Sequence, residues 1–261
     1  MLDPADLSGG ASRFLATQTF AVLTARDHHD RLWVSSLAGP PGFLEVSAAT
    51  TLQIHVVPQI EDPLHDLPSG QPVGVLAIDF SKRRRFRING RLTDRKDARL
   101  TVEAEQAYGN CPQYIHPREL ADAGLSVARE RTVAPPQVRS GLTTADAAGI
   151  TAADTFFLGT THPTRGADAS HRGGPAGFVR VVDDHHLWWP DYPGNNMFNS
   201  FGNLAVDPTA ALLFYDFTSC RSLHLSGTAK VEWTDPGVAG DDGRTGRRVG
   251  FTVEQVVVGP R

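Results

Sequence analysis

The stretch SSLAGPPGFLEV at residues 35–46 returns 135 residues later as SHRGGPAGFVRV at residues 170–181. Two further pairs keep nearly the same spacing: TFAVLT at residues 19–24 matches TFFLGT at 155–160, and the segment 78–90 matches 215–227. Self-similarity at one long period indicates that a whole small domain is repeated, because solenoid units are much shorter. The sequence therefore predicts two tandem copies of one domain.

Each copy has the residue pattern of a mainly β domain. Short runs rich in Val, Ile, Leu and Phe are bounded by Gly, Pro or Asp, which predicts strands. We expect strands over 19–25, 31–36, 52–57, 73–80, 85–90, 100–108, 222–227 and 251–258, and helices over 4–17, 143–149 (behind a threonine cap) and 195–206. Many short strands and few helices, in two copies, favour paired barrels.

A linker is expected between the copies. The pair Pro135-Pro136 interrupts any regular element and lies between the two repeated patterns. We expect a first copy over residues 1–130, a linker over 131–139 and a second copy over 140–261.

Composition excludes several classes of protein. The 261 residues carry a net charge of −4, which argues against nucleic acid as a partner. No apolar stretch approaches the roughly 20 residues that a membrane span needs, and the first ten residues do not have the pattern of a secretory signal. Cys111 and Cys220 are too few for a disulfide framework, and the histidines lack metal-ligand spacing. We expect a cytoplasmic protein without a metal that acts on a small molecule.

The two copies differ most after the Gly-Phe strand. The second copy has PDYPGNNMFNSFGN at residues 190–203, where the first has PQIEDPLHD at residues 58–66. A helix start rich in amides and hydroxyls predicts a cradle for a phosphate, whereas the three carboxylates of the first copy would repel one. A capped turn without any ligand explains the Asn-rich run equally well. We expect at most one anionic cofactor, held mainly by the second copy.

Arginines give a second indication. Arg172 stands where the first copy has Leu37, and a guanidinium suits a phosphate or a flavin carbonyl. A surface arginine at a strand end is the alternative. Arg221 is matched by Arg84 in the first copy, so a duplicated salt bridge explains it as well as a cofactor does.

The segments 170–179 and 190–204, followed by Asp207-Pro208, resemble the pyridoxamine 5′-phosphate oxidase-like flavin proteins. They are most similar to the duplicated branch of predicted flavin-nucleotide-binding proteins, which NCPQYI at residues 110–115 also resembles. The resemblance spans residues 19–233. It implies two tandem split β-barrels with a few short helices, forming a pseudo-dimer with FMN between them. Two such chains could pair into a further homodimer.

The resemblance also implies roles for particular residues. It places the FMN phosphate near Asn195, Asn196, Asn199 and Ser200, with Ser170 and Arg172 on the neighbouring strand and Arg221 facing the site. The first copy would lie against the other side of the cofactor through Arg85, Arg87 or Tyr114. The expected cofactor-binding residues are Ser170, Arg172, Pro190, Asp191, Asn195, Asn196, Asn199, Ser200 and Arg221.

The chain departs from the family in two respects. Asn196, Asn199 and Ser200 stand where the family carries Arg and Lys, which predicts weaker attraction for the phosphate. The segment with which the oxidase grips its phosphorylated amine is not found before Arg261, so synthesis of pyridoxal phosphate is not expected.

The leading hypothesis is an FMN-dependent oxidoreductase that passes electrons from a small molecule to oxygen or another small acceptor. A non-catalytic flavin-binding or redox-sensing module, a haem-binding split barrel, and use of the deazaflavin F420 are the alternatives. No catalytic residue is identified, because Asp191, Tyr192, His171 and Cys111 are candidates of equal rank.

Overall fold

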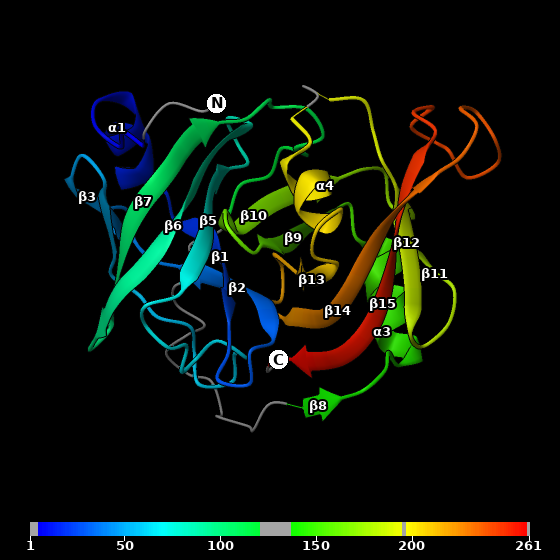
Figure 1. The fold of residues 1–261 in the computed structure, drawn as a ribbon, viewed down its shortest axis with the longest axis horizontal. Helices are drawn as coiled ribbons and strands as arrows, with labels where there is room; N and C mark the ends of the chain where they lie inside the picture. The colour runs from blue at the N-terminus through cyan, green and yellow to red at the C-terminus, as the bar shows by residue number, and fades with distance from the viewer. Residues whose placement is uncertain (1–4, 121–136, 195–196, 260–261) are drawn as a thin grey trace.

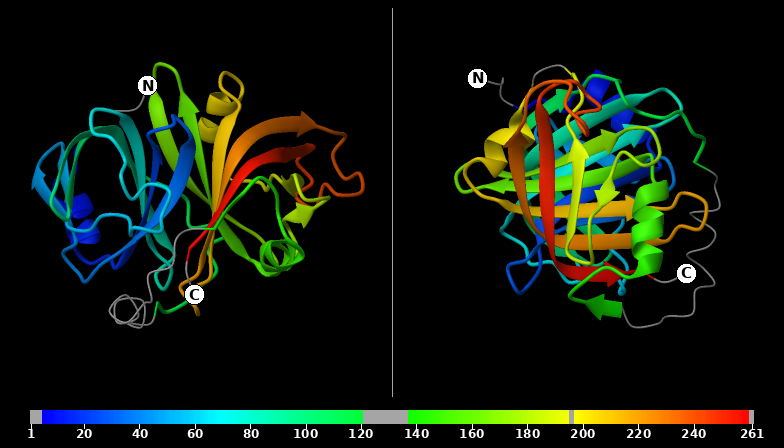
Figure 2. Two further views of the ribbon diagram at one scale, coloured as in Figure 1. Left: turned by 90° about the horizontal axis from the view of Figure 1, so that it is seen from below. Right: turned by 90° about the vertical axis from the view of Figure 1, so that its right-hand side faces the viewer.

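Two antiparallel sheets carry the fold, one from each half of the sequence (Figure 1). The computed structural model describes residues 5–120, 137–194 and 197–259. The first sheet has the order β2-β1-β5-β6-β7-β4-β3, and the second has the order β10-β9-β13-β14-β15-β12-β11, with β8 beside β15. Figure 2 shows the two halves lying side by side, the first in blue and cyan and the second in green to red.

The strands of the first sheet are β1 (Phe20–Arg26), β2 (Leu32–Ala38), β3 (Leu44–Ala48), β4 (Thr51–Ile54), β5 (Pro72–Asp79), β6 (Arg84–Lys96) and β7 (Arg99–Gly109). Those of the second are β8 (Gln137–Arg139), β9 (Thr155–His162), β10 (Gly166–Gly173), β11 (Arg180–Val181), β12 (His186–Pro190), β13 (Thr209–Tyr215), β14 (Ser222–Trp233) and β15 (Arg247–Val258). The described helices are α1 (Gly10–Ala16), α3 (Thr144–Ala152) and α4 (Asn199–Leu204).

The two sheets have one topology. When β1 to β7 are replaced in turn by β9, β10, β11, β12, β13, β14 and β15, the strand order of the first sheet becomes that of the second. The predicted duplication and the mainly β split-barrel fold are therefore confirmed. Residues 131–136 of the expected linker lie outside the described residues, and its last three form β8 instead, paired with β15.

The repeated Gly-Pro-x-Gly-Phe motif makes the same turn in both copies. The amide of Phe43 donates to the Pro40 carbonyl at 3.0 Å, and the amide of Phe178 donates to that of Pro175 at 2.9 Å. Gly42 and Gly177 have φ of 94° and 85°, a conformation that favours glycine. The turn thus accounts for the residues that both copies keep.

A second shared glycine sits at a bulge in the longest hairpin of each sheet. The register of β6 against β7 shifts at Asn89/Gly90, and that of β14 against β15 shifts at Ser226/Gly227. A Cβ on Gly90 would lie 2.0 Å from the Glu103 carbonyl oxygen, and one on Gly227 would lie 1.9 Å from that of Thr252. Only glycine therefore allows the two strands to approach this closely.

Three apolar clusters form the core. One lies inside the first copy, one inside the second, and a third lies between them. Alternate residues of the same strand enter different clusters: Ala21 and Leu23 of β1 face the core of the first copy, whereas Phe20 and Val22 face the second copy. Strands buried on both faces are apolar at every position, which explains the continuous runs seen in the sequence.

Helices α1 and α4 are shorter than expected, whereas α3 continues to Ala152, beyond the expected end at residue 149. Helix α3 begins behind Thr143, whose hydroxyl accepts from the Asp146 amide at 3.2 Å, as the threonine cap predicted. Helix α1 begins at Gly10 rather than at residue 4. Helix α4 begins at Asn199 rather than at residue 195, and its N-cap, Phe198, makes no side-chain cap hydrogen bond. Within the described ranges, no helix is long and apolar enough to cross a membrane.

The bulge glycines give a test of the fold. Gly90→Ala should lower the free energy of unfolding by about 2 kcal/mol or more, since the added methyl overpacks a site where backbone must move. Gly109→Ala is the matched control, because nothing lies within 4 Å of its added Cβ. Equal denaturation midpoints for the two variants would show that the strands do not approach closely at Gly90.

Candidate functional site

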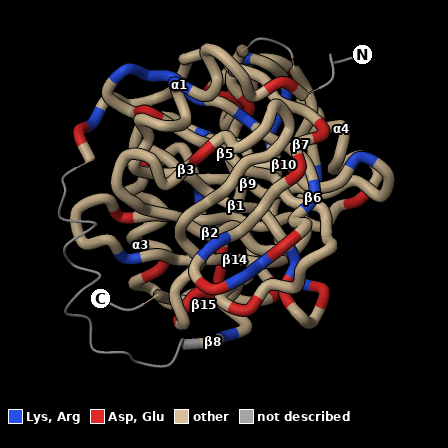
Figure 3. The backbone as a smooth tube through the Cα atoms, turned by 90° about the vertical axis from the view of Figure 1, so that its left-hand side faces the viewer, with Lys and Arg blue, Asp and Glu red and all other residues tan. Residues whose placement is uncertain are grey.

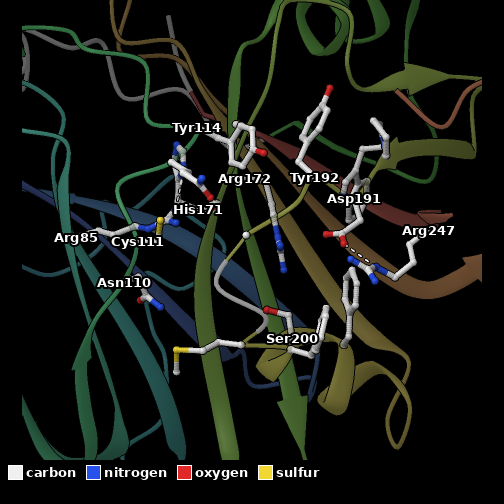
Figure 4. A pocket seen from close by; sticks show the side chains of 18 of the residues that line it. Arg85, Asn110, Cys111, Tyr114, His171, Arg172, Asp191, Tyr192, Ser200 and Arg247 are labelled. Carbon is white, nitrogen blue, oxygen red and sulfur yellow. Dashed lines mark hydrogen bonds and ion pairs between the residues drawn. The ribbon is translucent and has the colours of Figure 1, made fainter. Parts of the chain in front are cut away.

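A pocket opens where the two copies meet (Figure 4). The first copy contributes Arg85 and Arg87 of β6 and the segment 110–114 that follows β7. The second copy contributes the end of β10, the end of β12 with the residues after it, α4, and Arg247 of β15. Neither copy builds the pocket alone.

Four arginines line this pocket. Arg87 is paired with the buried Asp168, and its Nη1 lies 3.0 Å and 3.1 Å from the two carboxylate oxygens. Arg247 is paired with Asp191, Nε to Oδ2, at 2.8 Å. Arg85 donates to His171 Nδ1 at 3.0 Å and has no carboxylate partner within the described ranges. Positive charge therefore exceeds negative charge in the wall.

Arg172 is the least satisfied of the four. Its guanidinium lies over the Phe201 ring, 5.7 Å from the centroid, and its buried Nε has no hydrogen-bond partner. No carboxylate among the described residues lies within 4.0 Å of it. Burial lowers the pKa of Arg172 although Asp191 and Asp168 raise it, so these carboxylates offset only part of the cost of desolvation. An anionic ligand would offset more of it.

The pKa shifts agree with this charge balance. Burial, together with the neighbouring Arg87 and Arg172, lowers the pKa of Arg85 to about 10. Burial lowers the pKa of Arg172 as well. Burial, Arg85 and Arg172 lower the pKa of His171 well below its usual value, so its imidazole is neutral at pH 7. An anion entering the pocket would reverse these unfavourable interactions.

Unpartnered polar atoms gather here. Of the twelve buried side-chain atoms without a hydrogen-bond partner in the described part of the chain, six belong to residues of this pocket. These residues are Arg85, Arg87, Asn110, His171, Arg172 and Tyr192. Buried polar groups in proteins are normally paired, so such a concentration indicates a ligand site.

The expected site residues divide into four groups. Arg172, Pro190, Asp191 and Ser200 line the pocket, as do the expected cross-copy residues Arg85, Arg87 and Tyr114. Ser170 and Asn199 lie close by without lining it. Asn195 and Asn196 fall outside the described residues. Arg221 is not brought to this pocket, because it lines a second one on α3 and β13.

Ser200 and Ser170 belong to a buried polar network rather than to a helix-start cradle. The Ser200 hydroxyl lies 3.3 Å from both Asp168 Oδ2 and Ser170 Oγ. Asn89 Nδ2 also donates to Asp168, at 3.2 Å. Burial opposes the Arg87 charge, but Asp168 outweighs it and raises the pKa of Arg87. This network ties β6 of the first copy to β10 and α4 of the second.

Aromatic side chains form the mouth of the pocket. Tyr114 of the first copy is stacked on Tyr192 of the second, with centroids 5.1 Å apart and planes 22° apart. The Tyr114 hydroxyl donates to the Pro193 carbonyl at 2.8 Å. Asn199 Nδ2 donates to the Tyr108 hydroxyl at 2.6 Å, which is a further contact between the copies. A planar ring system would meet flat surfaces here.

Sequence reasoning missed Asp168, Arg247 and Tyr108. A signal for Asp168 was present, since a carboxylate between Ala167 and Ala169 interrupts an apolar strand. Nothing local marked Arg247, which reaches Asp191 only because β12 pairs with β15. Figure 3 shows Lys and Arg interspersed with Asp and Glu along the backbone of the first copy, whereas four arginines and one aspartate line the pocket.

The equivalent position in the first copy is filled by protein. Ser35, the counterpart of Ser170, donates to the buried Asp62. His224, the counterpart of Arg87, lies 3.7 Å from Asp62 through Nε2, and its Nδ1 donates to the Val34 carbonyl at 2.8 Å. Burial raises the pKa of Asp62. Asp62 and His224 thus occupy the position that corresponds, in the second copy, to the pocket.

These features define a duplicated split-barrel protein with an arginine-lined pocket between its halves. Residues 142–241, in the second copy, match the model of the family described as pyridoxamine 5′-phosphate oxidase. The resemblance seen in the sequence is thereby confirmed, and the second copy is a pyridoxamine 5′-phosphate oxidase-like domain.

Solved structures with similar chains have low identity. A variant of HupZ from Group A Streptococcus is 13% identical, with a TM-score of 0.35, over 44% of this chain and 98% of its own. A putative pyridoxamine 5′-phosphate oxidase from Lactobacillus delbrueckii is 17% identical, with a TM-score of 0.35, over 45% and 98%. An FMN-binding protein from Syntrophomonas wolfei is 7% identical, with a TM-score of 0.32, over 43% and 82%. The comparison with curated proteins gave no match.

The buried ion pair gives a test of the site. Asp168→Asn should lower the free energy of unfolding by about 3 kcal/mol, because it leaves the Arg87 charge buried and unpaired. Asp242→Asn breaks the ion pair between Asp242 and Arg180, whose side chains are 42% and 41% exposed, respectively. It should lower the free energy of unfolding by at most about 1 kcal/mol. Chemical denaturation measures both values. Equal losses would show that the Arg87–Asp168 pair has no special weight.

Proposed function

We propose that the pocket between the two copies binds flavin mononucleotide and that the chain is an FMN-dependent oxidoreductase. One observation carries the proposal. Among the described residues, Arg172, whose counterpart in the first copy is Leu37, forms no ion pair with a carboxylate within 4.0 Å, and neither does Arg85 beside it. A phosphate carries the charge and the acceptor oxygens that both side chains lack. The family match of the second copy supports the same cofactor class.

The fit is best at the anionic end of the cofactor. The pocket has a volume of about 120 Å³, which admits a phosphate group but not a whole flavin. Arg172 and Arg85 would hold the phosphate. The ring system would then extend toward the aromatic mouth, where Tyr114 and Tyr192 lie.

Bound FMN would supply the redox chemistry through its isoalloxazine ring. The chain's own residues would bind the cofactor and orient it. The Arg87–Asp168 pair fixes the wall from which Arg85 projects, and Arg247 holds the Asp191 carboxylate at 2.8 Å. His171 accepts from Arg85 at Nδ1, so its single proton sits on Nε2, and the imidazole can act as a neutral hydrogen-bond donor.

The same geometry argues against haem at this position. A histidine ligates iron through an unprotonated nitrogen, and His171 has none to offer while Arg85 donates to Nδ1.

Flavin binding can be measured directly. Titration of the apo protein into FMN, followed by quenching of flavin fluorescence, should show one site per chain. Arg172→Gln should weaken binding about 10- to 100-fold, because a hydrogen bond to a charged group contributes about 1.5–3 kcal/mol. Arg172→Lys should recover part of the loss, since it keeps the charge without the guanidinium fork.

Arg221→Gln is the matched control. It removes the same charge from the chain, and the residue lines a different pocket, so FMN affinity should not change. Loss of FMN binding in Arg221→Gln but not in Arg172→Gln would show that Arg221, and not Arg172, binds the phosphate. Consumption of a reduced nicotinamide by the FMN-loaded protein, above the rate of free FMN, would separate an oxidoreductase from a non-catalytic flavin-binding module.

A further inference from the structure

A basic cleft lies in the first copy, beside α1. It has a volume of about 470 Å³ and is bounded by the start of α1, the turn from β5 into β6 and the residues that follow β7. Sites for small molecules typically have volumes of about 300–1,000 Å³. Four consecutive cations, Lys82 to Arg85, line the cleft, and no Asp or Glu among the described residues does.

The protein neutralises only one of these cations. Lys82 Nζ lies 3.1 Å from Asp79 Oδ2. Arg83 donates to the Pro112 carbonyl at 3.3 Å, a contact with a neutral group. In the part of the chain that the structure describes, neither Arg83 nor Arg84 has a carboxylate oxygen within 4.0 Å. The cleft therefore carries an excess of positive charge.

The wall between this cleft and the pocket between the copies contains unsatisfied polar atoms. Arg85 and Asn110 line both cavities. Arg85 Nε and Asn110 Oδ1 are buried and have no hydrogen-bond partner. Burial, together with Arg87 and Arg172, lowers the pKa of Arg85 to about 10. Since buried polar atoms are normally paired, this wall indicates a ligand in addition to the free charges.

The second copy shows that the turn itself does not require the cations. Lys82 and Arg83 correspond to Ser219 and Cys220 in the repeat. Arg83 and Cys220 have φ of 52° and 57°, so the backbone is the same in both turns. A serine and a cysteine thus support the conformation equally well, and the fold does not explain the positive side chains of the first copy.

The equivalent cleft of the second copy has a different charge balance. Its volume is about 500 Å³, and Arg118 and Arg221 line it together with Asp146, Asp154 and Asp216. The two clefts are similar in size, but one is lined by four cations without a carboxylate and the other by two cations and three carboxylates. The copies therefore differ in the charge of the ligand that each cleft can accept.

We propose that the cleft beside α1 binds a small molecule that carries a diphosphate group. A single phosphate ester carries about −1.5 to −2 charges at pH 7, which is less than the charge of the four cations. Arginine side chains also match phosphate oxygens in geometry. The net charge of −4 argues against nucleic acid as the source of the phosphates. The proposal does not depend on flavin binding.

Calorimetric titration of the full-length protein with inorganic pyrophosphate tests the proposal. We expect saturable binding whose affinity Arg172→Gln, a change in the pocket between the copies, leaves within twofold. Orthophosphate, which carries less charge, should bind at least tenfold more weakly. ADP, in which a nucleoside is attached to the diphosphate, should compete with pyrophosphate because the cleft has room for an organic group.

Paired arginine variants locate the site. Arg83→Gln and Arg84→Gln should each weaken pyrophosphate binding about tenfold. Arg221→Gln, the counterpart of Arg84→Gln in the second copy, should leave it within twofold. FMN affinity should be unchanged in Arg84→Gln, so failure of the flavin proposal would be seen separately, in the FMN titration.

Four results would overturn the proposal. They are the absence of saturable binding at millimolar pyrophosphate, equal effects of Arg84→Gln and Arg221→Gln, failure of ADP to compete, and displacement of pyrophosphate by an oligonucleotide that lacks terminal phosphates. The last result would assign the cations to nucleic acid instead.

Discussion

The apolar layer between the two copies is the constraint on which the rest of the structure depends. Phe157 of β9, Leu213 of β13 and Leu76 of β5 point away from the cores of their own copies and into this shared layer. Burying each such side chain contributes about 1.5–3 kcal/mol, which an isolated copy would forfeit while exposing the face to water. The copies are therefore one folding unit in the energetic sense, although each has its own sheet.

That layer also determines where a pocket can exist. Backbones approach closely at its centre: a Cβ on Gly74 would lie 2.6 Å from the Ala169 amide nitrogen, and one on Gly159 would lie 2.6 Å from Val34 Cγ2. No ligand fits there. At the edge of the layer the apolar contacts give way to the Arg87–Asp168 pair, and beyond this pair the pocket opens. A buried ion pair is weak evidence for stability, but it fixes the wall that faces the ligand.

The sequence was sufficient for the sheets and insufficient for the orientation of single residues. Apolar runs predicted most of the strands, because strands buried on both faces leave an unbroken pattern. The Asn-rich segment was assigned a helix four residues too early, since its amides suit turns as well as helix starts. Arg221 was placed at the flavin because neighbouring strand residues face opposite ways and the register was unknown. Its counterpart is Arg84, which lies over Phe14, whereas Arg85 lines the pocket proposed for the flavin.

Duplication explains why this protein could diverge at two places without losing its fold. In a symmetric dimer, one substitution changes both sites at once, whereas a fused pair can fill one site and keep the other. Here Asp62 and His224 fill one of two equivalent positions, and Ser200 and Arg87 leave the other open. The copies also differ at their helices, where Phe14 of α1 and Gly149 of α3 line clefts of about 470 Å³ and about 500 Å³. Both differences lie outside the repeated Gly-Pro-x-Gly-Phe turn and the bulge glycines, whose replacement would disturb the backbone itself. The residues that both copies keep thus fix the backbone, and those in which they differ decide what each copy can bind.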